Sequence, residues 1–202
     1  MKRILSLGIL TAICVSLFTF KANAATKHTV VSGDTMWKIA VRYEVGLSEI
    51  KAENTHIKNP DLIYPGQVLN IPAKDAAASA YESEVIRLVN EIRTERGLKP
   101  LTYDWQLSRV ARYKSEDMRA NRYFSHQSPT YGTPFQMIKS FGISYKSAGE
   151  NIAKGYRTPK AVVDGWMNSS GHRANILNAS FTHIGVGYVA DGSYWTQMFI
   201  GK

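Results

Sequence analysis

Residues 27–72 fit four short elements and their turns into under 50 positions, which leaves few possible folds. The sequence predicts a strand over residues 28–31 and a closing strand over 67–71 that stops at Pro72. Two helices lie between them: the first follows a Ser-Gly-Asp-Thr turn, and the second is predicted to begin with Ser48 as its cap. The predicted order is therefore strand, helix, helix, strand.

The first predicted helix supplies most of the core of this region. Its core side is expected to carry Trp37, Ile39, Ala40 and Tyr43. Gly46 is predicted to break the helix. On this interpretation Trp37 belongs to the core rather than to a ligand contact, and His28 and His56 are exposed.

Three motifs of this region follow one another at fixed spacing. They read VSGDTMWKIA over residues 31–40, NPDLIYPGQ over 59–67 and LNIP over 69–72. Together they resemble a LysM domain along its full length and without a gap. The resemblance implies a βααβ fold that binds polymers containing N-acetylglucosamine, such as peptidoglycan or chitin.

Two turns of this module are the candidate glycan-binding segments. An acetamido sugar needs backbone donors and acceptors for its acetamide group, and apolar surface under its methyl group and ring faces. Glycine and proline permit turns that expose the backbone in this way. The alternative for any single residue is that it only caps a helix or shapes a turn. The candidate glycan-binding residues are Gly33, Asp34, Thr35, Ile63, Tyr64, Pro65 and Gly66.

The second region, residues 81–202, follows an alanine-rich stretch over 73–80. We interpret that stretch as a short linker, in part helical and continuous with the next helix. Four helices are predicted: the first ends at Gly97, and the other three begin at Asp104, Thr133-Pro134 and Thr158-Pro159.

The end of the second region carries two alternating strands around Asp191-Gly192-Ser193, which predict an antiparallel hairpin. Helices followed by a hairpin indicate the α+β class, with helices packed on a small sheet.

Three further signatures lie in the second region. They read YFSHQSP over residues 123–129, AGENIA over 148–153 and WMNSSGHRANIL over 166–177, the last followed by IGVGY. In this order they resemble the CAP superfamily of cysteine-rich secretory, antigen and pathogenesis-related proteins, in a cysteine-free bacterial form. The resemblance implies an α–β–α sandwich with a cleft in which two histidines and two acidic side chains meet. Some members bind a divalent metal there.

The resemblance carries three of those four cleft positions onto His126, Glu150 and His172, whereas the fourth, usually Glu, falls on Ser169. Two histidines and one carboxylate can still hold a divalent metal such as zinc, with water in the open place. Two nearby acidic residues could replace the missing ligand, although no spacing argument places them in the cleft: Glu116 and Asp117.

Catalysis at this cleft is a separate hypothesis. Glu150 could act as a general base beside a bound water, with His126 or His172 orienting or donating. No Ser or Cys nucleophile motif is present, and the resemblance implies no uniform reaction. The plainer interpretation is that these three side chains hold the cleft wall together by hydrogen bonds. His183 is expected to be structural.

Residues 1–24 read as a secretory signal, with a basic start, an apolar run over 4–20 and small residues Ala22 and Ala24. We expect cleavage after Ala24, with an uncleaved anchor as the alternative. The single cysteine, Cys14, lies in this segment, so the mature chain can form no disulfide. Cleavage leaves 22 basic and 16 acidic side chains, a net charge of +6. In an exported chain this charge favours an anionic envelope over nucleic acid.

The sequence therefore predicts a secreted, wall-attached binding protein with no membrane span after cleavage. Its LysM region would hold peptidoglycan, and its CAP region would present a cleft to a protein, lipid or peptidoglycan ligand. One alternative is a LysM-targeted wall hydrolase or peptidase that uses Glu150 with or without a divalent metal. A second is a structural component of the spore coat or cortex, since residues 57–67 are similar to the LysM of spore-coat assembly proteins.

Overall fold

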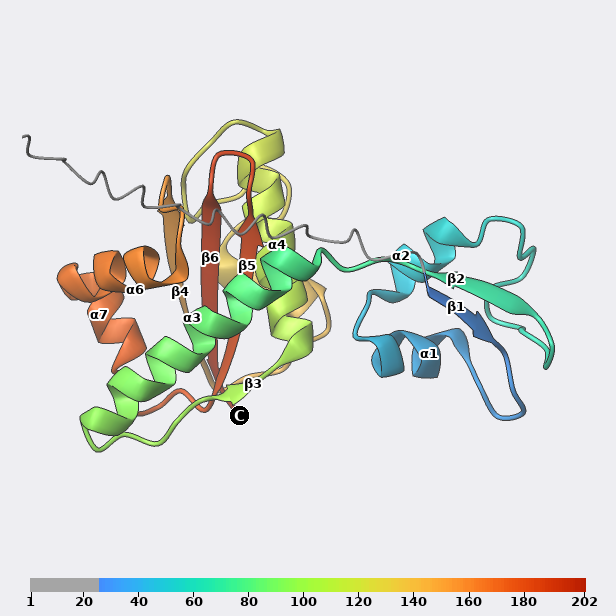
Figure 1. Ribbon diagram of the computed structural model, residues 1–202, viewed down its shortest axis with the longest axis horizontal. Helices are drawn as coiled ribbons and strands as arrows, with labels where there is room; N and C mark the ends of the chain where they lie inside the picture. The colour runs from blue at the N-terminus through green and yellow to red at the C-terminus, as the bar shows by residue number, and fades with distance from the viewer. Residues whose placement is uncertain (1–25) are drawn as a thin grey trace, which may run out of the picture.

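The computed structural model describes residues 26–202, so the predicted signal segment lies outside the described residues. Figure 1 shows two bodies of unequal size joined end to end. The smaller body contains the first four elements, and the larger body contains all elements from α3 onward.

The smaller body is a two-stranded sheet covered by two helices. β1 (Thr26–Thr29) pairs antiparallel with β2 (Val68–Ile71), and α1 (Met36–Tyr43) and α2 (Leu47–Glu53) connect them. This is the predicted βααβ order. Its core is one cluster of buried apolar side chains: Val30, Met36, Ile39, Ala40, Val45, Ile50, Leu69 and Ile71.

The prediction for Trp37 was wrong, because its side chain is 52 % exposed. The helix begins at Met36, with Thr35 as the cap whose side chain accepts a hydrogen bond from the Lys38 N–H. Met36, Ile39 and Ala40 therefore follow the i, i+3, i+4 spacing of one buried face, and position 37 falls outside it.

Two smaller predictions for this body were also wrong. His28 is buried, with only 8 % of its surface exposed, because Asp34 and Tyr43 both bond to its ring. The second helix is capped by Gly46 rather than Ser48. The Glu49 side chain accepts a hydrogen bond from the Gly46 N–H at 2.8 Å, so the helix starts two residues earlier than predicted.

The larger body is built on a four-stranded sheet with the order β3-β5-β6-β4. The predicted hairpin is confirmed: β5 (His183–Val189) and β6 (Tyr194–Gly201) pair antiparallel. β4 (Ser147–Lys154) adds antiparallel to β6, and β3 (Thr102–Tyr103) adds parallel to β5. β4 is therefore an edge strand.

Helices cover both faces of this sheet, which confirms the α–β–α sandwich. α3 (Ala76–Glu95), α6 (Pro159–Asn168) and α7 (Ser170–Ile176) pack around Ile184, Val186, Trp195 and Phe199 on one face. α4 (Trp105–Ala120) and α5 (Pro134–Ser140) pack around Met198 and Ile200 on the other. The odd-numbered apolar side chains of β6 thus pack against one helical layer, and the even-numbered ones pack against the other.

Two glycines of β5 let α4 lie directly on the sheet. A Cβ at Gly187 would stand 2.1 Å from the Arg112 backbone nitrogen, and one at Gly185 would stand 2.3 Å from that of Ser108. Both positions face α4, while Ile184 and Val186 face the other layer. The IGVGY motif therefore sets the distance between helix and strand.

The connection between the two bodies is short. α3 begins at Ala76, inside the predicted linker, with the Asp75 side chain accepting hydrogen bonds from the N–H groups of residues 77 and 78 at 2.9 and 3.0 Å. The linker is therefore largely helical and continuous with α3.

Glu49 joins the smaller body to α4. Its Oε1 accepts hydrogen bonds from Arg109 Nε at 2.9 Å and from the Tyr113 hydroxyl at 2.6 Å. A Cβ at Gly46 would stand 2.2 Å from Arg109 Nη2, so this contact also depends on glycine. We call these three hydrogen-bonded residues, Glu49, Arg109 and Tyr113, the Glu49 clasp.

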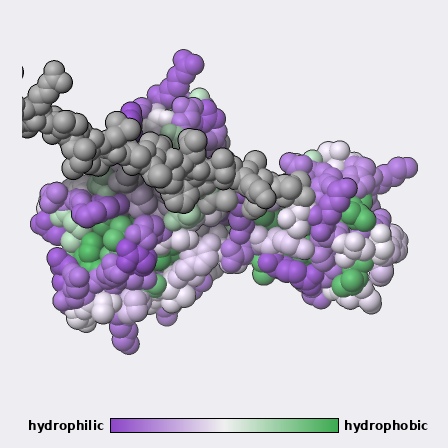
Figure 2. Space-filling view, in the orientation of Figure 1, coloured by the Kyte–Doolittle hydropathy of each residue, from purple (hydrophilic) through white to green (hydrophobic). Residues whose placement is uncertain are grey.

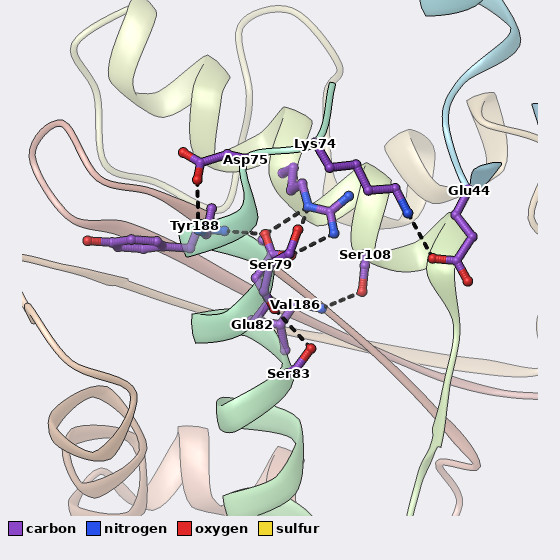
Figure 3. Close-up of polar contacts among 12 residues, drawn as sticks. Glu44, Lys74, Asp75, Ser79, Glu82, Ser83, Ser108, Val186 and Tyr188 are labelled. Atoms are coloured by element: carbon purple, nitrogen blue, oxygen red, sulfur yellow. Dashed lines mark hydrogen bonds and ion pairs between the residues drawn. The ribbon is translucent and has the colours of Figure 1, made fainter. Parts of the chain in front are cut away.

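A second group of polar contacts lies beside the same junction, and one of them crosses it (Figure 3). Lys74 of the linker pairs with Glu44 of the smaller body at 2.9 Å. Glu82 of α3 accepts hydrogen bonds from Arg112 Nε and Nη2 at 2.8 and 2.6 Å, and from the Tyr188 N–H at 3.0 Å. Burial raises the pKa of Glu82, and the bonds from Arg112 oppose that rise. These contacts tie α3 to α4 and β5.

The surface is mostly hydrophilic, with separate hydrophobic patches on both bodies in the view of Figure 2. None of the helices in residues 26–202 combines the length and the apolar character that crossing a membrane requires.

Candidate functional site

The first candidate glycan-binding turn, residues 33–35, is organised by the carboxylate of Asp34. Its Oδ2 accepts hydrogen bonds from the Val31 N–H at 3.1 Å and pairs with His28 Nε2 at 2.8 Å, and its Oδ1 pairs with Arg42 at 3.2 Å. The hydrogen bond from His28 is the main cause that lowers the pKa of Asp34. Only 4 % of the Asp34 side chain is exposed, so this residue shapes the turn from beneath.

The second candidate turn, residues 63–66, lies beside the first. The Gly66 N–H donates to the Val30 carbonyl at 2.9 Å, and the Val30 N–H donates to the Gln67 carbonyl at 2.8 Å. Gly66 has a φ of 90°, which favours glycine. Tyr64 is 56 % exposed. The structure thus brings both predicted turns together at one end of the smaller body.

The cleft of the larger body lies at the free edge of β4. His126 and His172 both line a cavity of about 570 Å³ there, together with Ile152 of the strand. His126 comes from the loop after α4, and His172 comes from α7 on the opposite layer. Residues 46 positions apart in the sequence therefore meet at this edge, as the family resemblance predicted.

Glu150 stands behind His126. Its Oε1 accepts a hydrogen bond from His126 Nδ1 at 2.7 Å when the carboxyl group is ionised. The Glu150 side chain is only 2 % exposed, and its Oε2 has no hydrogen-bond partner within residues 26–202. Burial raises the pKa of Glu150. The carboxyl group therefore orients the imidazole and does not itself line the cleft.

Lys114 holds the loop that carries His126, and the sequence analysis missed it. Its ammonium donates hydrogen bonds to the carbonyls of Ser125 and His126 at 2.8 and 2.9 Å, and to the Tyr123 hydroxyl at 3.1 Å. The residue is 1 % exposed, and burial lowers its pKa. A signal was available: position 114 follows 107, 110 and 111 on the buried face of α4.

The segment that carries His172 is fastened to the edge of β4 by side chains. Trp166 Nε1 donates to the Ile152 carbonyl at 3.2 Å, and Asn175 Nδ2 donates to the Glu150 carbonyl at 3.2 Å. Asn151 Nδ2 donates to the His172 carbonyl at 3.1 Å. The first two of these bonds occupy carbonyl acceptors that the edge strand would otherwise expose. Burial, and then the nearby His126, lower the pKa of His172.

The metal hypothesis finds little geometric support. Within residues 26–202, no three His, Cys, Asp or Glu side chains form a cluster that could hold a metal ion. Glu150 bonds to Nδ1 of His126 from behind and has only 2 % of its side chain exposed, so its carboxylate does not face the cleft. Position 169 is a serine at the junction of α6 and α7 and supplies no carboxylate. The donor set as arranged does not fit zinc, so no chemical step is assigned to a metal.

The two acidic residues considered as substitutes have other partners. Asp117 accepts hydrogen bonds from Ser128, Thr130 and Tyr123, which fold the 123–130 loop. Glu116 pairs with Arg119 on the same helix. Both therefore support structure outside the cleft.

A second hollow, of about 400 Å³, lies between the two bodies. Its charged side chains include Glu49, Arg109 and Lys74, which are paired with each other or with neighbours across the junction. Because these charges already have partners, the cleft at β4 is the better candidate for a ligand site.

These features define a class: an α–β–α sandwich with a histidine-lined cleft at its edge strand, joined to a βααβ module. The chain belongs to the CAP family, described as the cysteine-rich secretory protein family, whose model matches residues 86–200. The model of the LysM domain matches residues 28–72.

One relative and one solved structure each resemble about two thirds of this chain. The protein YkwD of Bacillus subtilis (strain 168) is 65 % identical over 127 residues, which cover 63 % of this chain and 49 % of that protein. A crystal structure of an extracellular SCP-domain protein from Bacillus anthracis is 37 % identical, with a TM-score of 0.60, and covers 68 % of this chain and 47 % of that one. The chain thus spans about half the length of each.

The LysM segment has relatives of its own. The spore coat assembly protein ExsA of Bacillus cereus is 49 % identical over 47 residues, which are 23 % of this chain and 7 % of that protein. The match is about as long as the LysM segment, residues 28–72.

Proposed function

We propose that the protein holds peptidoglycan, or another polymer of N-acetylglucosamine, through its LysM domain and presents the CAP cleft to a ligand in the envelope. The observation that carries this proposal is the adjacency of the turns over residues 33–35 and 63–66. They lie side by side, joined through Val30, and they leave Tyr64 and the surrounding backbone exposed. Backbone groups beside an apolar ring are what an acetamido sugar requires.

We further propose a location outside the cell, at the wall or in the spore coat or cortex. The secretory signal predicted over residues 1–24 supports export. The likeness of the LysM segment to a spore coat assembly protein supports the spore as one site of action.

Sedimentation with purified peptidoglycan tests the glycan-binding proposal. The chain without residues 1–24 is expected to sediment with the polymer, and Tyr64→Ala is expected to reduce the bound fraction several-fold. A single small module gives weak binding, so loss of one exposed ring removes a large share of it. Tyr103→Ala is the matched control, because Tyr103 is 45 % exposed but belongs to the CAP domain. Equal sedimentation of all three proteins, at the level of a protein without LysM, would contradict the proposal.

A wall hydrolase that uses Glu150 is the second candidate. The Glu150–His126 pair and the raised pKa of Glu150 are the observations in its favour. Against it, a general base must reach the proton it removes, and the Glu150 side chain is 2 % exposed. We therefore favour binding over hydrolysis.

Zymography on peptidoglycan separates these two candidates. We expect no cleared zone from either the wild-type protein or Glu150→Gln, because the carboxyl group is sealed behind His126. Clearing by the wild type that disappears in Glu150→Gln would reverse the order of the two functions.

A further inference from the structure

The rim of the CAP cleft carries exposed apolar side chains. Phe124 is 50 % exposed and Phe135 is 48 % exposed, and both line the cleft together with Pro134. Single exposed aromatic side chains are common, whereas two at the rim of one cleft provide a surface on which a flat apolar face can lie.

The lining of this cleft carries no formal charge apart from its two histidines. Within residues 26–202, no Lys, Arg, Asp or Glu lines it. The Glu150 carboxyl group is behind the wall, and the Lys114 ammonium is used by three oxygen atoms. A phosphate or carboxylate ligand would lose hydration on entering the cleft, and no Lys or Arg in the lining would compensate for that loss. The cleft is therefore suited to an uncharged ligand.

Polar groups that can recognise such a ligand stand beside the rim. With Nδ1 of His126 donating to the Glu150 carboxylate, Nε2 becomes an acceptor for a ligand hydroxyl or amide group. Gln127 also lines the cleft, and the primary amide of its side chain both donates and accepts. That pairing matches an acetamido group, which carries one N–H and one carbonyl.

We propose that the CAP cleft binds an uncharged N-acetylated sugar ring, with one ring face on Phe124 and Phe135 and its polar groups toward His126 and Gln127. The inference rests on the proposed function, because the sugar would belong to the same wall glycan that the LysM domain holds. A single chain would then contact its polymer at two places. The observation that favours a sugar over a lipid headgroup is the absence of a fixed cation or anion in the lining within residues 26–202.

NMR titration of the chain without residues 1–24 with N,N′-diacetylchitobiose tests this inference. Two separate groups of signals are expected to shift, one from residues 63–66 and one from His126, His172 and the rim aromatics. Tyr64→Ala should remove the first group only. Phe124→Ala combined with Phe135→Ala should lower the affinity reported by the second group of signals about tenfold, because stacking contributes on the order of 1.4 kcal/mol. Phe135→Tyr should keep it.

The outcomes distinguish the inference from the proposed function. Shifts confined to residues 63–66 would overturn the second sugar site and leave the LysM proposal standing. Shifts confined to the cleft would support the second site and contradict the LysM proposal. If phosphatidylglycerol vesicles move the cleft signals and the disaccharide does not, the ligand is a lipid and the inference is wrong. Tyr103→Ala, exposed but outside the cleft, should leave both groups unchanged.

Discussion

Gly187→Ala is expected to lower the free energy of unfolding by about 3 kcal/mol, at the upper end of what overpacking costs. The added Cβ would stand 2.1 Å from the backbone nitrogen of Arg112 and 2.2 Å from the backbone carbon of Ala111. Backbone atoms cannot rotate away as the end of a side chain can. α4 would have to move off β5, which would also disturb Lys114 and the loop that it holds.

Thermal or denaturant unfolding measures this effect, and Gly171→Ala is the matched control. Gly171 lies in α7, and a Cβ there would meet nothing within 4 Å. Alanine in a helix is more favourable than glycine by up to about 1 kcal/mol, so the control should be neutral or stabilising. If both substitutions had the same effect, α4 could not lie against β5 as the structure has it.

Asp34→Asn is expected to weaken sedimentation with peptidoglycan about tenfold, because a loosened turn must be ordered when the glycan binds. The substitution keeps the shape of the side chain but removes its charge. Asp34 orders the turn through contacts with His28, Arg42 and the Val31 N–H, so the turn should loosen. Co-sedimentation and the melting temperature are the measurements.

Asp61→Asn is the control for this prediction, since its side chain is 84 % exposed in the same domain. It should bind as the wild type does. Equal loss in both variants would mean that overall charge, and not the order of the turn, supports binding.

The lowered pKa of Asp34 also sets a pH range for this contribution. The hydrogen bond from His28, and then that from the Val31 N–H, hold the pKa below its ordinary value of 3.8. A lowered pKa means that the ionised form is stabilised by folding. The stabilisation from Asp34 is thus present above that ordinary value and is lost only as the pH falls through the lowered one. The Asp34 carboxyl group itself should therefore stay ionised from neutral pH to about pH 5.

The sequence predicted the smaller body well because its turns and helices obey local rules. The error at Trp37 came from the helix register: positions 36, 39 and 40 form the buried face, and a large aromatic residue beside them was assigned to it. His28 could not be assigned from its neighbours in the sequence, since its partners include Tyr43, 15 residues away.

β4 was not predicted as a strand, for a physical reason. Residues 147–154 read SAGENIAK, with Ile152 as their only β-branched residue and no aromatic one. They become a strand because all eight pair with β6 and because Trp166 and Asn175 bond to the outer edge. Tertiary contacts of this kind leave no periodic pattern in the sequence.

The cleft was predicted through family resemblance and not from spacing. His126 and His172 come from different layers, and only the fold brings them to one edge. Lys114 was overlooked because a lysine in a helix is usually solvated, although its register placed it on the buried face.

The Glu49 clasp and the helical linker fix the orientation of the LysM domain relative to the CAP domain. A domain on a flexible tether samples many orientations, and its reach depends on the length of the tether. Here Glu49 holds the LysM domain against α4 through hydrogen bonds from Arg109 and Tyr113. Burial acts to raise the pKa of Glu49, but the bonds from Tyr113 and Arg109 outweigh it, so the pKa is lowered and the carboxylate stays ionised. Once the LysM domain is bound to a glycan chain, the CAP cleft would lie at a fixed orientation and a fixed distance relative to that chain.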